Sequence, residues 1–61
     1  MPKNVLIILT DGFEEMEAVT PIDILRRAGL EVMVAGLNKK EIVGSHGIKI
    51  IADRLLSDVV G

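Results

Sequence analysis

Carboxylates crowd one short segment of this 61-residue chain. Asp11 is followed closely by Glu14, Glu15 and Glu17. Carboxyl groups gathered at a site can act as general acids or bases, or can tune a neighbouring nucleophile. Acids at the start of a helix also have a simpler use, because negative charge there complements the helix macrodipole. The choice between these interpretations depends on the elements that position the segment.

The residues on either side of the acidic segment predict a βαβ unit. Residues 4–9 form a continuous run of β-branched residues and leucine, typical of a strand covered on both faces. A helix is expected from about Glu15 to Ala28, closed by Gly29 in a left-handed cap. Residues 31–36 form a second apolar strand. We therefore expect two parallel strands joined by a right-handed helical crossover.

The rest of the chain predicts a small hairpin and then a helical turn. Ile42-Val43 and residues 48–51 flank the turn-forming residues 44–47, which favours an antiparallel pair that leaves the main sheet. Residues 53–60 are expected to form a loop followed by the start of a helical turn. A two-stranded parallel sheet with one helix leaves its edges exposed. The chain is therefore expected to be part of a larger domain or an oligomer.

Composition narrows the classes of function. The net charge is -2 and the basic residues are scattered, which argues against a nucleic-acid partner. The apolar run at residues 5–9 is far shorter than a signal-peptide core or a membrane span, so we expect a cytoplasmic protein with no membrane partner. The chain has no cysteine, a single histidine and no tight cluster of metal ligands along the sequence. We expect no metal, no cofactor and, from this chain alone, no thiol catalysis.

The acidic loop also excludes phosphate-binding functions. In open α/β folds, ligands sit beyond the carboxyl ends of the strands, which is where residues 11–17 fall. A nucleotide site needs glycines and bare amides facing the phosphate. Gly12 is the only glycine in this loop, and the negative charge of the loop would repel a phosphate. The sequence therefore argues against a dinucleotide-binding site and against a P-loop.

Pro21 singles out Glu17 among the acids. A proline lacks the amide that would bond the carbonyl four residues earlier, and that carbonyl belongs to Glu17. Either the helix is locally distorted at Glu17, or it begins later, with Thr20 as N-cap and Pro21 at its first position. In both cases Glu17 lies in a non-ideal turn at the mouth of the sheet.

Two stretches and the hairpin together carry a family resemblance. They read Leu9-Thr10-Asp11-Gly12-Phe13-Glu14-Glu15-Met16-Glu17-Ala18-Val19, Pro21-Ile22-Asp23-Ile24-Leu25-Arg26-Arg27-Ala28-Gly29, and Val43-Gly44-Ser45-His46-Gly47-Ile48 with Ala52-Asp53. The chain resembles the ThiJ/PfpI family, in particular the branch that contains the Parkinson-disease-linked deglycase. The resemblance implies an α/β, flavodoxin-like, doubly wound parallel sheet. Residues 1–61 would be the N-terminal part of a single domain, supplying its first βαβ unit and a small hairpin.

The resemblance also implies a function for the complete domain. The family carries a cysteine on a strained strand-to-helix elbow further along the chain, and the acid matching Glu17 hydrogen-bonds its sulfur. A carboxyl that donates to a thiolate lowers the pKa of the cysteine. The implied activity is a cofactor-independent, cysteine-dependent glyoxalase or deglycase acting on methylglyoxal-type carbonyls or their adducts. The alternatives are a redox-responsive stress protein or chaperone of the same fold, and a PfpI-type peptidase.

The helix and the hairpin supply further candidates. One helix face should pack on the sheet: Ala18, Val19, Ile22 and Leu25. A second stripe, which the family buries between two subunits, contains Met16, Thr20, Asp23 and Arg27, with Asp23 and Arg27 forming an i,i+4 ion pair. One interpretation of His46 is a solvated or backbone-bonded turn residue. The resemblance implies another: relatives often have an arginine at this place, which reaches the site region of the partner subunit, with Glu14 and Arg27 nearby. Glu14, Glu15, Met16, Asp23, Arg27 and His46 are thus site or dimer-interface candidates. In some family members a second cysteine occupies the place of Gly44.

Overall fold

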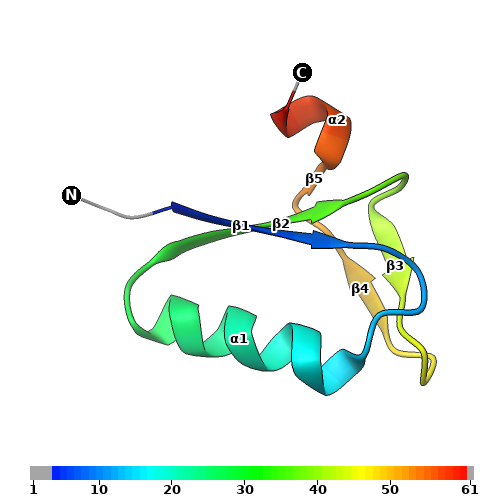
Figure 1. Cartoon of the computed structure of the whole chain (residues 1–61), viewed down its shortest axis with the longest axis horizontal. Coiled ribbons are helices and arrows are strands. Elements are labelled where there is room, and N and C mark those ends of the chain that lie inside the picture. Colours follow the sequence, from blue (N-terminus) through cyan, green and yellow to red (C-terminus); the bar gives the residue numbers. More distant parts are fainter. Residues whose placement is uncertain (1–3, 61) are drawn as a thin grey trace.

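The structure is a computed structural model that describes residues 4–60 (Figure 1). Its helices and strands follow the order β1, α1, β2, β3, β4, β5, α2. Their bounds are Asn4–Leu9 (β1), Glu15–Arg27 (α1), Glu31–Gly36 (β2), Glu41–Val43 (β3), Lys49–Ile51 (β4), Arg54–Leu55 (β5) and Leu56–Val59 (α2).

The main sheet is parallel, with β2 between β1 and β5. β1 and β2 pair along their full lengths, from Asn4 opposite Glu31 to Leu9 opposite Gly36. α1 lies against one face of this sheet (Figure 1). The predicted βαβ unit is therefore confirmed. β5 was not expected, because a strand of two residues is too short to carry a sequence pattern. The helical turn predicted after it is present as α2.

The core lies between the sheet and α1 and reaches under the hairpin. Its buried members are Leu9, Ile22, Val32, Val34, Ile42 and Ala52. The opposite face of β1 is open: Leu6 is 39% exposed and Ile8 is 50% exposed. The apolar run had predicted a strand covered on both faces, but within residues 4–60 only the α1 side of β1 is covered.

α1 begins at Glu15, because Glu14 acts as its N-cap. The Glu14 carboxylate accepts a hydrogen bond from the Met16 amide at 3.0 Å. The later start at Thr20 is therefore wrong, and Pro21 lies inside the helix. No helix within residues 4–60 is both long and apolar enough to cross a bilayer.

The carboxyl end of α1 closes in a Schellman motif. The Leu30 amide donates to Leu25 and the Gly29 amide donates to Arg26, as this motif requires. Gly29 has a φ of 89°, which confirms the predicted left-handed cap. Leu30 and Leu25 both pack against the core, so the cap also fixes the direction of the chain into β2.

The predicted hairpin is confirmed as a separate antiparallel sheet of β3 and β4. Ile42 anchors it in the core, with 1% of its surface exposed. The predicted packing face of α1 is correct for Ala18, Ile22 and Leu25. It is wrong for Val19, which is 44% exposed because it lies toward the hairpin side of the helix, where a shallow pocket opens.

Candidate functional site

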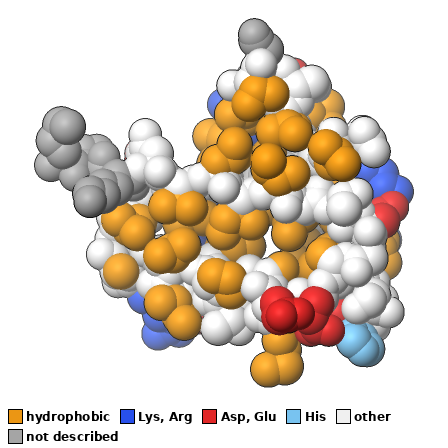
Figure 2. All heavy atoms as spheres, viewed as in Figure 1, with side chains coloured by type: hydrophobic (Ala, Val, Ile, Leu, Met, Phe, Trp, Pro, Cys, Tyr) orange, Lys and Arg blue, Asp and Glu red, His pale blue; other side chains and the backbone are white. Residues whose placement is uncertain are grey.

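The acidic segment lies where the sequence predicted it, at the carboxyl end of β1 and beside the hairpin (Figure 1). Figure 2 shows acidic side chains gathered at one corner of the molecule next to the single histidine. This corner combines the first turn of α1 with the turn between β3 and β4. We call it the acidic corner; its members are Glu14, Glu15, Ser45 and His46.

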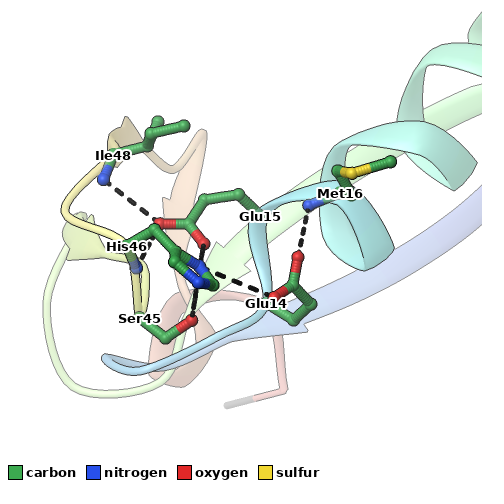
Figure 3. Close-up of polar contacts among 6 residues, drawn as sticks. All are labelled: Glu14, Glu15, Met16, Ser45, His46 and Ile48. Atoms are coloured by element: carbon green, nitrogen blue, oxygen red, sulfur yellow. Dashed lines mark hydrogen bonds and ion pairs between the residues drawn. The ribbon is translucent and has the colours of Figure 1, made fainter.

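Glu15 is the buried member of the acidic corner, with 6% of its surface exposed. One carboxylate oxygen accepts the backbone amides of His46 at 2.7 Å and Ile48 at 3.2 Å. The other lies 3.0 Å from Nδ1 of the His46 ring and 3.5 Å from the Ser45 hydroxyl (Figure 3). Because both oxygens have partners, the carboxylate can be buried without an unpaired charge.

These contacts set the charge states in the corner. Burial raises the pKa of Glu15, but hydrogen bonds from the His46 ring and from backbone amides outweigh it and lower that pKa to about 2. The pKa of His46 is raised, chiefly by its hydrogen bond with Glu15 and then by the negative charges of Glu15 and Glu14. Glu15 is therefore an anion at neutral pH, and the neighbouring imidazole is biased toward its cationic form.

Gly44 completes the fit between the hairpin turn and Glu15. A Cβ atom added to Gly44 would overlap the Glu15 side chain, with Cδ at 2.5 Å and Cγ at 2.8 Å. The position is buried, and its backbone is outside the left-handed region. Glycine is required here by the close approach of the carboxylate. A larger side chain at this place would require the Glu15 carboxylate to shift.

The loop before α1 is also bound to the hairpin. The Gly12 amide donates to the Val43 carbonyl at 2.8 Å, and the Val43 amide donates to the Asp11 carboxylate at 3.0 Å. Lys39 forms an ion pair with Asp11 at 2.8 Å. The hydrogen bond from Lys39, followed by that from the Val43 amide, lowers the pKa of Asp11. The whole segment from β1 to α1 is thus held against β3.

The other predicted site residues are at the surface. Glu17 is exposed, and within residues 4–60 its side chain makes no hydrogen bond or ion pair. Glu14 caps α1 with one oxygen, while the other lies 3.6 Å from Nδ1 of His46. Met16 is 76% exposed. Asp23 and Arg27 form the predicted i,i+4 ion pair at 3.0 Å, away from the acidic corner on the same helix.

The fold creates a group of possible metal ligands that the sequence spacing did not indicate. Glu14, Glu15 and His46 offer donor atoms within 4.8 Å of one another. The group is not visible along the sequence because the fold brings together residues that are 31 or 32 positions apart. However, the Glu15 oxygens and the His46 Nδ1 already bind each other and the hairpin amides. The donor set therefore fits an internal ion pair better than a metal site.

Sequence reasoning missed the special position of Glu15. It treated Glu15 as one of several acids in the first helical turn, and it did not connect this acid with Gly44 or Ser45. The only available signal was the glycine-flanked turn at residues 44–47, which the sequence places in a hairpin. No sequence pattern predicts that this turn binds the carboxylate of Glu15 and not those of the neighbouring acids.

Comparison with known proteins identifies the family. The sequence profile of the DJ-1/PfpI family matches residues 3–60. The chain belongs to the DJ-1/PfpI family. Among DJ-1/PfpI relatives, protein dj-1beta of Drosophila melanogaster is 48% identical over 60 residues, covering 97% of this chain and 32% of that protein. The putative cysteine protease YraA of Bacillus subtilis is 37% identical over 60 residues, covering 97% of this chain and 36% of that protein.

Solved structures of DJ-1/PfpI proteins show the same fold. The crystal structure of Drosophila melanogaster DJ-1beta matches with a TM-score of 0.93 at 47% identity, over 97% of this chain and 32% of that chain. The α/β, flavodoxin-like class predicted from the sequence is thereby confirmed. The chain spans about a third of the length of these relatives.

Proposed function

We propose that these 61 residues form the N-terminal part of a single DJ-1/PfpI domain, and that the remainder of the polypeptide completes the sheet. The open face of β1, with Leu6 and Ile8, supports this proposal, as does the span of only a third of the relatives' length. We expect the isolated chain to lack a cooperative thermal transition, because a sheet exposed on one face buries too little apolar surface. A sharp transition at low protein concentration would contradict the proposal.

The complete domain is proposed to be a cysteine-dependent glyoxalase or deglycase acting on methylglyoxal-type carbonyls or their adducts. The observation that carries this proposal is the contrast between two neighbouring acids. Glu15 is fully bonded to the hairpin, whereas Glu17 presents an exposed carboxyl from the first turn of α1. That carboxyl is available to a group that the remainder of the polypeptide brings to the ends of the strands.

The proposed chemistry uses a cysteine from the remainder of the domain. Its thiolate adds to the aldehyde carbon, forming a C–S bond, while the electrons of the C=O bond go to the oxygen, which takes a proton. Glu17 is proposed to hydrogen-bond the sulfur and to deliver that proton. A hydrogen bond to the thiolate stabilises the charged form of the sulfur and lowers the pKa of the cysteine. This step needs no cofactor.

Substitution of Glu17 in the complete domain tests this assignment. Glu17→Gln keeps the shape of the side chain but removes the acidic proton. We expect the thiol to become about tenfold or more weaker as an acid, and methylglyoxal consumption to fall, because an amide is a weaker donor to the thiolate than a carboxyl group and cannot deliver a proton. Thiolate absorbance against pH and a methylglyoxal assay measure the two effects. If both are unchanged, Glu17 does not have the proposed role.

A peptidase is the second candidate function, because the relative YraA is described as a putative cysteine protease. Peptide hydrolysis needs a general acid that protonates the leaving amine, a task usually given to a histidine beside the cysteine. A histidine in hydrogen-bond contact with the thiol, together with cleavage of a fluorogenic peptide, would favour the peptidase. Methylglyoxal turnover without peptide cleavage favours the first candidate. A thiol that oxidises reversibly but turns over neither substrate would favour the redox alternative.

The exposed stripe of α1 is proposed to form a homodimer interface. Met16 is 76% exposed and begins a stripe that also includes the exposed residues Thr20 and Asp23, and methionine is enriched at interfaces. We expect Met16→Lys in the complete domain to shift the sedimentation profile from dimer to monomer, whereas Lys40→Ala, at an exposed loop position, should leave it unchanged. A wild-type domain that sediments as a monomer would overturn the proposal. The cytoplasm remains the proposed compartment.

A further inference from the structure

Glu15 is a buried carboxylate that the proposed chemistry does not use. Only 7% of its side-chain surface is exposed, compared with 39% for Glu14, which precedes it in the same turn. Burying a charge is costly unless it is fully paired, and Glu15 is paired by groups from the hairpin. This buried charge fixes the position of the helix start relative to the hairpin, because any shift between them would leave hydrogen-bonding groups unpaired.

The first turn of α1 needs this external support. Pro21 has no amide, so the carbonyl of Glu17 cannot receive its usual helical hydrogen bond. The turn keeps the bond from the Ala18 amide to the Glu14 carbonyl at 2.9 Å. The hairpin holds this turn from outside the helix, through the Glu15 carboxylate and the Phe13 carbonyl. Glu17 therefore belongs to a segment whose position depends on Glu15.

The hairpin turn is shaped to receive Glu15. Gly44 leaves room for the carboxylate, and two amides of residues 44–48 point at one of its oxygens. The Ser45 amide also donates to the Phe13 carbonyl at 2.8 Å, so the backbones of the two segments are joined directly. Figure 3 shows Glu15 reaching from α1 into this turn, with the His46 ring beside it. Helix start and hairpin turn form one unit.

We propose that Glu15 is a positioning residue, whose carboxylate locks the first turn of α1 onto the 44–48 turn and so fixes Glu17 in the orientation that acts on the thiol. This inference rests on the proposed function, because it concerns the same site. It assigns Glu15 no contact with substrate and no proton transfer. Its effect on the thiol is transmitted through Glu17.

A double-mutant cycle in the complete domain tests the proposal. The thiol pKa is measured from thiolate absorbance in the wild type, Glu15→Gln, Glu17→Ala and the double variant. We expect Glu15→Gln to weaken the thiol as an acid by about threefold or more in the wild-type background. In the Glu17→Ala background, the same change should have no further effect, because the side chain through which Glu15 acts is gone.

Two further variants separate positioning from loss of stability. Gly44→Ala displaces the Glu15 carboxylate from the hairpin side and should also raise the thiol pKa. This variant replaces Glu15→Gln in the test if Glu15→Gln does not fold. Gly29→Ala strains the other end of α1, where an added Cβ meets no heavy atom within 4 Å, and should leave the thiol pKa unchanged. Glu31→Gln, at an exposed strand position, controls for the exchange of a carboxylate for an amide.

The outcomes are distinguishable. Equal effects of Glu15→Gln with and without Glu17 would overturn the inference, since Glu15 would then act on the thiol by another route. A lower melting temperature with an unchanged thiol pKa would also overturn it, leaving Glu15 with a structural role only. If Glu17→Ala alone has no effect on the thiol, the proposed role of Glu17 is wrong, and the inference about Glu15 is wrong with it.

Discussion

The two ends of α1 are each tied to distant parts of the chain by charged groups, but the environments of these groups differ. At the amino end, the Glu15 carboxylate is buried and bonded to the hairpin turn through amides and the His46 ring. At the carboxyl end, Arg26 and Asp53 form an ion pair of 3.3 Å with side chains 49% and 50% exposed. Solvent-exposed pairs contribute little to stability, whereas a buried charge forces a defined geometry. The proposed site lies at the end with the defined geometry.

The largest effects are expected from substituting the two glycines that lie against the ends of α1, which are Gly44 in the hairpin turn and Gly29 in the cap. Gly44→Ala places a methyl group against Glu15 and is expected to destabilise the complete domain by about 1–3 kcal/mol through overpacking. Gly29→Ala meets open space, but its φ of 89° strains an L-residue, at a cost of about 1–2 kcal/mol. Chemical denaturation with both variants gives these free energies of unfolding.

Alanine and asparagine should rank in opposite orders at the two positions. Asn tolerates the left-handed conformation, so Gly29→Asn should be less damaging than Gly29→Ala. At Gly44 the larger side chain increases the overlap with Glu15, so Gly44→Asn should be worse than Gly44→Ala. The same ranking at both ends would mean that the structural distinction between them is wrong.

The amino end should also respond to pH. The pKa of His46 is raised, so the stabilisation by its charge is complete below its unfolded value of 6.5 and is lost as the pH rises through the raised value. Glu15 has a pKa lowered from 4.5 to about 2, so its contribution is complete above 4.5 and is lost in acid. Asp11, with its lowered pKa, also contributes to the loss in acid.

His46→Asn isolates the alkaline part of this profile. We expect the melting temperature of the wild type to fall by a few degrees between about pH 5.5 and about pH 8.5, the range in which a histidine loses its charge. The variant should show a smaller fall over the same range. Parallel curves for the two proteins would show that the His46 charge does not stabilise the amino end.

The ion pair at the carboxyl end should contribute little. Asp53→Asn removes the charge opposite Arg26 but keeps an oxygen that can accept from the Val34 amide, which donates to Asp53 at 2.9 Å. The expected loss is about 1 kcal/mol or less, and it should shrink further in high salt. A loss comparable with that of Gly44→Ala would remove the contrast between the two ends.

The smallest effect is expected on the exposed stripe of α1. Asp23→Asn breaks the ion pair with Arg27, whose side chains are 57% and 79% exposed, and should cost about 0.3–0.5 kcal/mol. Measurement at a concentration where the domain is monomeric isolates this intrahelical pair. A markedly larger loss that appears only at high concentration would instead place the pair at the proposed dimer interface.

The order of elements could be predicted from the sequence because local patterns encode it. The apolar runs defined β1 and β2, and Gly29 marked the end of α1. β5 was missed because its pairing with β2 is set by the three-dimensional course of the chain and not by a pattern within two residues. The start of α1 was left open because Pro21 is compatible with two positions, and only the capping contact of Glu14 decides between them.

The candidate site was only partly predictable for a related reason. Its location at the end of β1 follows from the topology of parallel sheets. Which acid is buried depends on a contact between positions 15 and 44–48, and this contact leaves no periodic signal in the sequence. The family resemblance directed attention to Glu17, whereas the structure adds Glu15 and Gly44 as the residues that hold its turn in place.

A crystal structure of the complete domain in its reduced state tests the central claim most directly. The decisive quantity is the distance between the Glu17 carboxyl oxygens and the nearest cysteine sulfur. We expect this distance to fall within hydrogen-bond range, with Glu15 still bound to the hairpin turn. A domain in which no cysteine sulfur approaches Glu17, or in which another acid takes this place, would contradict the account.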